Sequence, residues 1–400
     1  MSHHILTLNA GSSSVKFALF SAGSSDDALP RAMWIGHADG LGAGLQAKLL
    51  IRDAAGKTLL DTALSGADAN HQGALAALLA WREANAGDVH IAAVGHRIVH
   101  GGMHFTAPVR IDAQVIQDLA ALEPLAPLHQ PHNLAGVRAA MQAFAGVPQV
   151  ACFDTAFHAS QPDVNRRFAL PRALHDEGVR RYGFHGLSYE SIVAQLGAVD
   201  PLLATGRLIV AHLGNGASMC AIAGGRSVAT TMSFSPLDGL TMGTRCGQLD
   251  AAVVLYLQRA RGMTPDEVER LLFRESGLLG LSGVSSDMRA LEASTSHAAV
   301  EAIDHFVEQI VQQMGRLAAA LRGVDGIVFT GGIGENAAGL RERVLAACAW
   351  MGVRPAAAAH QQGATRLTAA YSPVAAWVIR TDEEAVIARH ARQVLETDAQ

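Results

Sequence analysis

The clearest pattern near the start of the chain is a pair of apolar runs that flank a short polar turn. Residues 5–8 and 15–20 are rich in β-prone apolar side chains, and residues 9–14 read Asn-Ala-Gly-Ser-Ser-Ser. This pattern predicts a β-hairpin. Because Gly11 lets the backbone turn sharply, the N–H groups and hydroxyls of the turn can face a phosphate, with Lys16 as a nearby cation. The turn is not a Walker loop, since the G-x-x-x-x-G-K-[ST] pattern is absent.

The same pattern returns about half a chain later. Residues 208–222 again read as a strand, a Gly/Asn/Ser turn and a second strand, with Gly214, Asn215 and Gly216 at the turn. Two hairpins of this kind predict a duplicated nucleotide-binding core that grips a phosphate chain. In this respect the chain resembles the actin-like ATPase and sugar-kinase superfamily, an α/β fold with a ribonuclease H-like core.

Other elements follow from the period of the apolar residues. Apolar positions three and four apart predict helices over residues 71–83, 112–122, 188–196 and 299–321. Thr264 and Glu267 form a capping box, with Pro265 at the first helical position. Short apolar runs predict strands near residues 33–35, 90–99, 149–153, 326–330 and 376–380. The long Gly-rich loop at residues 233–245 separates firm elements and is therefore a candidate functional loop.

Composition limits the class of protein. The chain has 400 residues, half of them hydrophobic, which is enough for two domains with a large core. We expect an N-terminal domain of residues 1–153 plus 383–400 and a C-terminal domain of residues 154–382, with the active site in the cleft between them. A net charge of −5 provides no cationic face for nucleic acid or an anionic membrane. Four scattered cysteines and the lack of a membrane-spanning apolar run predict reduced thiols and a cytoplasmic location.

Two other site classes fit the sequence less well. Histidines are frequent between His96 and His212, but their close pairs are separated by Gly-Gly or Pro, and no cysteine or carboxylate completes a zinc ligand set. Residues 332–337 match the G-x-G-x-x-A pattern of dinucleotide-binding oxidoreductases. The acidic residue which that fingerprint requires for the ribose is missing from residues 354–360.

Charged side chains at loop starts indicate phosphoryl transfer. Arg97 and Arg245, together with His185, can neutralise charge on a phosphoryl group and an anionic acceptor. Asp154 follows a predicted strand, where it can position the acceptor or a metal ion. Hard oxygen ligands for Mg²⁺ are offered near the two ends of the chain by Asn9 and Glu383.

Six motifs in a fixed order closely resemble the acetokinase family of short-chain acyl kinases. They occupy residues 9–16, 95–102, 153–158, 182–186, 212–216 and 329–336, and the similarity extends from residue 8 to about residue 387. The resemblance implies reversible transfer of a phosphoryl group from ATP to acetate, which gives acetyl phosphate and ADP. It also implies direct in-line transfer, a requirement for Mg²⁺ (or Mn²⁺) and a homodimer.

Alternatives to acetate remain open. Propionate and butyrate are alternative acceptors, since one methylene in an apolar pocket changes binding by only ~1–3 kcal/mol. A non-catalytic, ATP-gated binding module of the actin type is a further alternative. Such a module would have no need of two arginines and a histidine directed at a phosphoryl acceptor.

The resemblance also implies roles for individual residues. The catalytic residues would be Asp154, His185 and Arg245. Arg97 would bind the acceptor carboxylate, and the acyl pocket would be formed by Val99, Leu128, Phe184 and Pro236. The metal would be held by Asn9 and Glu383. The nucleotide would be bound by Lys16, His212, Leu213, Gly214, Asn215, Gly216, Asp287, Met288, Arg289, Gly332, Ile333, Gly334, Glu335 and Asn336.

One position departs from the family pattern. After Arg245 the family usually reads Ser-Gly-Asp, whereas this chain reads Cys246-Gly247-Gln248. We expect the loss of a carboxylate at position 248 to alter how Arg245 is oriented.

Overall fold

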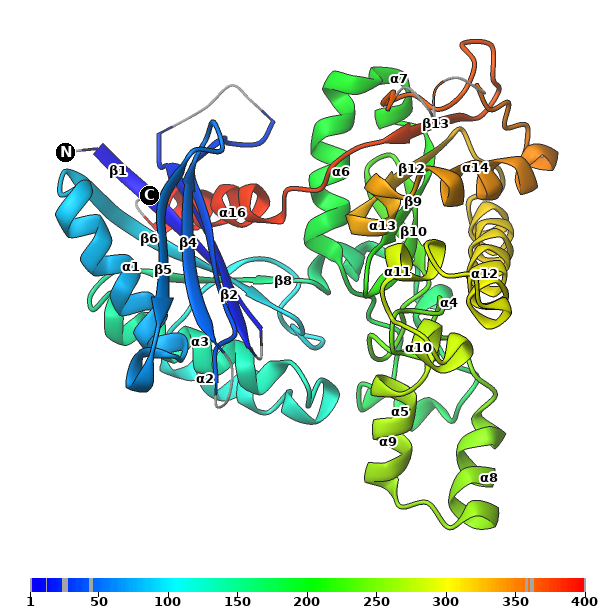
Figure 1. The fold of residues 1–400 in the computed structure, drawn as a ribbon, viewed down its shortest axis with the longest axis horizontal. Helices are drawn as coiled ribbons and strands as arrows, with labels where there is room; N and C mark the ends of the chain where they lie inside the picture. The colour runs from blue at the N-terminus through cyan, green and yellow to red at the C-terminus, as the bar shows by residue number, and fades with distance from the viewer. Residues whose placement is uncertain are drawn as a thin grey trace. The chain divides into compact units, whose positions relative to one another are not determined.

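The structure, a computed structural model, describes residues 2–11, 13–23, 28–42, 46–356, 359 and 363–398 (Figure 1). Contacts divide the chain into two compact units. The first unit comprises Met1–Phe157 with Asp382–Gln400, and the second comprises His158–Thr381. Ser12 of the predicted phosphate turn, and residues 1, 399 and 400 of the predicted first domain, lie outside the described residues.

The first unit is built on a mixed sheet. Its strand order is β5-β4-β3-β2-β1-β6-β8-β7. The central strand β1 pairs antiparallel with β2 and parallel with β6. The strands are β1 (Ser2–Ala10), β2 (Ser14–Ser21), β3 (Ala32–Asp39), β4 (Ala47–Asp53), β5 (Thr58–Leu64), β6 (Val89–Ile98), β7 (Val109–Arg110) and β8 (Gln149–Phe153).

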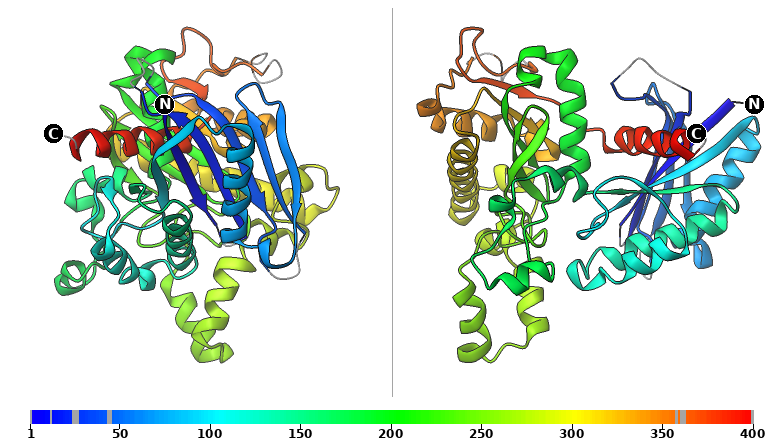
Figure 2. Two further views of the ribbon diagram at one scale, coloured as in Figure 1. Left: turned by 90° about the vertical axis from the view of Figure 1, so that its left-hand side faces the viewer. Right: turned by 180° about the vertical axis from the view of Figure 1, so that it is seen from behind.

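Helices cover both faces of this sheet. They are α1 (His71–Asn85), α2 (Ala113–Ala120), α3 (Gln130–Ala143) and α16 (Glu383–Asp398). One face buries Leu6, Leu8 and Phe17 with apolar residues of α1 and α3. The chain's last helix, α16, packs on β1 and β6 (Figures 1 and 2). It approaches so closely that a Cβ atom on Gly95 would lie 2.5 Å from the Ile387 side chain.

The second unit has a smaller sheet, with the order β11-β10-β9-β12-β13. Its strands are β9 (Arg207–Leu213), β10 (Ala217–Ala223), β11 (Arg226–Thr230), β12 (Gly326–Thr330) and β13 (Ala375–Val378). Helix α12 packs on β9, β10 and β11, and α6 packs on β9. The helices are α4 (Asp163–Arg166), α5 (Arg172–Asp176), α6 (Gly186–Val199), α7 (Pro201–Ala204), α8 (Ala251–Arg261), α9 (Pro265–Arg274), α10 (Gly277–Ser282), α11 (Met288–Glu292), α12 (His297–Leu321), α13 (Gly331–Asn336) and α14 (Ala338–Ala347).

The two sheets share one topology. The order β3-β2-β1-β6-β8 corresponds to β11-β10-β9-β12-β13, with two antiparallel pairings followed by two parallel pairings in each. The predicted duplication of an α/β core is therefore confirmed. Each copy begins with one of the two predicted hairpins, β1–β2 or β9–β10.

Most predicted elements are present, with some differences. The strands at residues 149–153 and 326–330 and the capping box of Thr264 have the predicted positions. Strands β4 and β5, which widen the first sheet, were not predicted. None of the described helices is both long and apolar enough to cross a membrane.

Three buried histidines predict a loss of stability in acid. Burial lowers the pKa of His96, His100 and His158 from 6.5 to about 4. In the window between these values the unfolded chain binds more protons than the fold. The free energy of unfolding should therefore fall as the pH drops, by up to ~1.4 kcal/mol per pH unit for each histidine. Asp382 and Glu384, whose pKa values are raised by burial, oppose this trend.

Urea unfolding between about pH 7 and 5 measures this slope. A His158→Gln variant should reduce the slope, and the matched change at exposed His104 should leave it unaltered. A stability independent of pH across this window would contradict the prediction.

Candidate functional site

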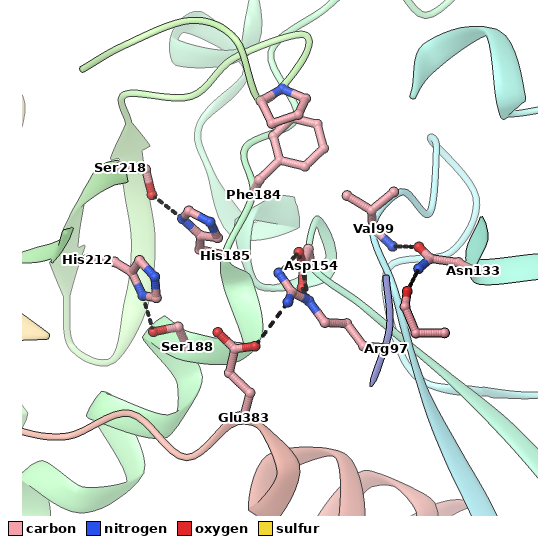
Figure 3. A network of polar contacts seen from close by, with 12 residues as sticks. Arg97, Val99, Asn133, Asp154, Phe184, His185, Ser188, His212, Ser218 and Glu383 are labelled. Atoms are coloured by element: carbon pink, nitrogen blue, oxygen red, sulfur yellow. Dashed lines mark hydrogen bonds and ion pairs between the residues drawn. The ribbon is translucent and has the colours of Figure 1, made fainter. Parts of the chain in front are cut away.

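In the first unit, an ion-paired arginine lies where two parallel strands end. Arg97 is the penultimate residue of β6, and Asp154 directly follows β8, the parallel neighbour of β6. Arg97 Nε donates to Asp154 Oδ1 at 3.0 Å, and Nη2 donates to Oδ2 at 2.7 Å. On the opposite edge of the guanidinium, Nη1 lies 3.3 Å from Glu383 Oε2 at the start of α16 (Figure 3). The fold thus brings together three residues that the sequence predicted to serve one site.

The ion pair of Arg97 and Asp154 is largely shielded from solvent. The side chain of Asp154 is 1% exposed and that of Arg97 is 24% exposed. Burial alone would lower the pKa of Arg97, but the charges of Asp154 and Glu383 outweigh it and raise the pKa above the usual value. The guanidinium is therefore a permanent cation in a fixed plane, which suits recognition of a carboxylate.

An asparagine connects the first hairpin to the same loop. Asn133 of α3 accepts a hydrogen bond from the Val99 N–H at 2.9 Å and donates to the Ala10 carbonyl at 2.9 Å (Figure 3). Val99 is buried, and Leu128 is half-buried in the segment before α3. Sequence reasoning missed Asn133, which lies in the first turn of α3.

Acidic residues crowd the start of α16. Burial, followed by the charge of Glu383, raises the pKa of Asp382, and the same two causes raise that of Glu384. Both line a hollow of about 330 Å³ together with Lys16. Lys16 therefore lies near these carboxylates in the first unit, and its predicted contact with ATP phosphates stays a prediction. Among the described residues, no three His, Cys, Asp or Glu side chains form a metal-binding group.

In the second unit, two stacked histidines stand beside the second hairpin. The rings of His185 and His212 lie 4.3 Å apart at an angle of 27°. His185 Nδ1 is 2.9 Å from Ser218 Oγ, and His212 Nδ1 is 2.8 Å from Ser188 Oγ (Figure 3). Because each Nδ1 is engaged by a serine, each Nε2 is directed elsewhere. Both serines were missed by sequence reasoning.

The backbone that carries His185 is constrained. His185 has a φ of 59°, which is unusual for a residue with a side chain and marks functional sites. His158 Nε2 donates to the Phe184 carbonyl at 2.9 Å, while its Nδ1 lies 2.9 Å from Ser227 Oγ. Burial lowers the pKa of His158 to about 4, so it is a neutral donor at pH 7. His158 thus fixes the loop before His185.

Arg245 faces the same space as His185. A methyl group on Gly216 would lie 3.6 Å from Arg245 Nη2 and 3.6 Å from His185 Nε2. Burial lowers the pKa of Arg245, and within the described part of the chain Arg245 forms no ion pair. The space beside Gly216 therefore combines an uncompensated positive charge with converging N–H groups, which suits an anion. Arg245 Nη1 donates to the carbonyl of the buried Pro236 at 2.9 Å, which orients the guanidinium, and the expected effect of position 248 stays a prediction.

A larger hollow of about 760 Å³ lies in the second unit, within the size range of ligand pockets. Most of the predicted nucleotide-binding residues line it, with Ser286, Glu292 and Ala337 as additions that were not among the predicted binding residues. Its lining residues from the predicted set are Gly214, Asn215, Asp287, Met288, Arg289, Gly332, Ile333 and Asn336. Of the predicted residues outside this lining, Gly334 is buried within α13, and Glu335 accepts from the Gly331 N–H at 3.0 Å. Their contact with the nucleotide stays a prediction.

The family model described as "Acetokinase family" matches residues 4–389. The chain belongs to the acetokinase family. A relative named acetate kinase from Methylocella silvestris is 51% identical over 401 residues, covering 99% of each chain. Another acetate kinase, from Rhizobium meliloti, is 47% identical and covers 96% of this chain and 97% of its own length.

Solved structures agree with this membership. A propionate kinase from Francisella tularensis has a TM-score of 0.89 at 34% identity, covering 98% of this chain and 100% of its own. The acetate kinase of Porphyromonas gingivalis has a TM-score of 0.86 at 34% identity, with the same coverage. The predicted fold class of the acetokinase chain, a duplicated actin-like α/β fold, is confirmed.

The buried carboxylate of Asp154 predicts a strong dependence of stability on Arg97. In Arg97→Met the carboxylate loses its guanidinium partner, and the free energy of unfolding should fall by ~3–5 kcal/mol. Urea unfolding measures the loss, and Arg97→Met/Asp154→Asn should recover part of it. The exposed pair of Lys48 and Asp61, 2.9 Å apart, is the control, and Lys48→Met should cost at most ~1 kcal/mol. Equal losses at the two pairs would refute the buried-pair account.

Proposed function

We propose that this acetokinase is an ATP:acetate phosphotransferase that forms acetyl phosphate and ADP by direct in-line transfer. The observation that carries the proposal is the space beside Gly216, where Arg245 and His185 converge. A transferring phosphoryl group spreads negative charge over its equatorial oxygens, and catalysis depends on donors placed to stabilise that charge. The relatives named acetate kinase supply the acceptor class.

The acceptor would be held by the first unit. Arg97 would bind the carboxylate of acetate, and Asp154 would fix the plane of its guanidinium through the two-point contact. The methyl group would contact Val99 and Leu128, and the parts of Phe184 and Pro236 in acyl binding stay predictions. Because a related structure is a propionate kinase, an acid with a longer acyl chain is the second candidate acceptor.

The nucleotide would be held by the second unit. The hollow lined by Asp287–Arg289 and α13 would take the nucleoside, and the β9–β10 turn with His212 would take the phosphates. Gly243 supports this turn because its N–H donates to the Asn215 carbonyl at 3.0 Å, in a place where any Cβ would collide with the Asn215 side chain. Lys16 would add a cation from the first hairpin.

Acyl phosphate formation tests this function directly. ATP, Mg²⁺ and acetate, propionate or butyrate are incubated with the enzyme, and the acyl phosphate is trapped with hydroxylamine. Gly216→Ala should keep its thermal midpoint, because the new methyl makes only ordinary contacts, but lose at least ~10-fold in turnover by occupying the phosphoryl space. Gly339→Ala, which meets open space on α14, is the control. No acyl phosphate from any acid, or full activity of Gly216→Ala, would reject the proposal.

The acidic start of α16 fits a divalent cation. Asp382, Glu383 and Glu384 are adjacent, and the crowding of their carboxylates would be relieved by a bound cation. We propose that Asn9 and Glu383 hold Mg²⁺, or Mn²⁺ in its place, in contact with the phosphates. When bound, the ion would neutralise phosphate charge. The same carboxylate of Glu383 also steadies Arg97.

Glu383→Gln should raise the Mg²⁺ concentration needed for half-maximal activity and lower turnover, because few protein oxygens hold the ion. Glu384→Gln is the matched control, and it should change the Mg²⁺ requirement far less. Activity assays over a Mg²⁺ titration, with Mn²⁺ binding followed by electron paramagnetic resonance, distinguish the two. If Glu384→Gln were the damaging change, the metal assignment would be wrong by one residue.

We also propose a homodimer that uses α8. No residue of α8 is buried, and its apolar side chains Val253, Leu255 and Tyr256 are all exposed, so that a second copy could cover part of this helix. Leu255→Glu should halve the mass measured by analytical ultracentrifugation. Leu202→Glu, at an exposed leucine of α7, should leave the mass unchanged. An unchanged mass for Leu255→Glu would place the interface elsewhere.

Two further expectations stay proposals. We propose that the domains are residues 1–153 with 383–400 and residues 154–382. A cytoplasmic location is supported by four free cysteines, three of them buried.

A further inference from the structure

Arg245 is carried by an irregular segment, residues 231–250, that connects β11 to α8. Hydrogen bonds, not regular structure, hold this segment. Its Thr241 hydroxyl lies 3.1 Å from His305 Nε2, and its Gln248 Oε1 accepts from Gln313 Nε2 at 3.2 Å. Both partners belong to α12, the 25-residue helix that packs on the sheet of the second unit. The longest helix therefore anchors the arginine segment at two points.

Gln313 is well suited to act as an anchor. It is only 4% exposed, and both ends of its amide are used, since Oε1 accepts from Arg316 Nη1 at 3.4 Å while Nε2 donates to Gln248. A buried amide that loses its partner is costly, so the contact resists breaking. Gln248 transmits the restraint, because its own N–H donates to the Gly239 carbonyl at 2.9 Å. This contact closes residues 239–248 into a loop that contains Arg245, and Pro236 lies just before that loop.

We propose that Gln313 is a positioning residue for Arg245 and acts through Gln248. The inference rests on the proposed role of Arg245 in stabilising the transferring phosphoryl group. The amide of Gln248 accepts from a neutral donor and adds no charge near Arg245, so the guanidinium keeps its full charge for the phosphoryl group.

A double-mutant cycle on turnover tests the proposal. Gln313→Leu and Gln248→Leu should each lower kcat by about 5-fold to 10-fold, the effect of one misplaced neutral hydrogen bond. The KM values for acetate and ATP should stay unchanged, because Arg97 and the nucleotide hollow are untouched. The double variant should lose no more than either single variant. Gln312→Leu is the control, since Gln312 bonds Glu308 on the exposed side of α12.

The Arg245→Ala background separates this inference from the proposed function. If Arg245→Ala itself turns over normally, the proposed function of Arg245 fails. If Arg245→Ala is impaired, adding Gln313→Leu should cause no further loss in kcat. A further loss in kcat when Gln313→Leu is added to Arg245→Ala would overturn the positioning role. So would a double variant Gln313→Leu/Gln248→Leu whose loss in kcat is the product of the two single losses. Thermal midpoints show whether all variants are folded.

Discussion

The pairing of Arg97 with Asp154 is the interaction on which the account of this chain depends. It fixes a guanidinium at the ends of two parallel strands, and Glu383 completes its surroundings from α16. Arg245 in the second unit has the opposite surroundings. It is half-buried, held by a backbone carbonyl, and has no carboxylate partner among the described residues. The charge of Arg97 is therefore balanced by carboxylates and its plane is fixed, which suits an acceptor carboxylate with a single negative charge. Arg245 keeps its charge available, which suits the more highly charged phosphoryl group.

Duplication of the fold explains how the two arginines come to differ. Both units start from the same hairpin and sheet order, yet the first hairpin presents Asn9 and Lys16, while the second presents His212 and Gly216. One helix of each unit follows, in the chain, a strand of the other unit's sheet. Helix α6, which follows β8 of the first sheet, packs on β9, and α16, which follows β13 of the second sheet, packs on β1 and β6. As a result, the metal-binding candidate Glu383 reaches the first sheet from the far end of the chain.

Sequence reasoning succeeded where the signal was local. The hairpins, the capping box at Thr264 and the strand before Gly331 are fixed by short-range patterns, and each is present. Strands β4 and β5 were missed because charged residues such as Lys48 and Asp61 lie among their apolar residues, at the exposed edge of the sheet. The contact of Arg97 with Glu383 joins opposite ends of the chain, and no spacing rule reports it. The left-handed backbone of His185 and the carbonyl that orients Arg245 likewise depend on tertiary contacts.

Direct in-line transfer is the central claim, and buried carboxylates near Arg97 make a phosphorylated enzyme the main rival. The stereochemical course at phosphorus decides between them. The reaction is run with acetate and ATP that is chiral at the γ-phosphorus through oxygen isotopes, and the configuration of the acetyl phosphate is determined. A single in-line displacement predicts inversion of configuration. Retention would mean two successive displacements through a carboxylate such as Glu383 or Asp154, and would contradict the account.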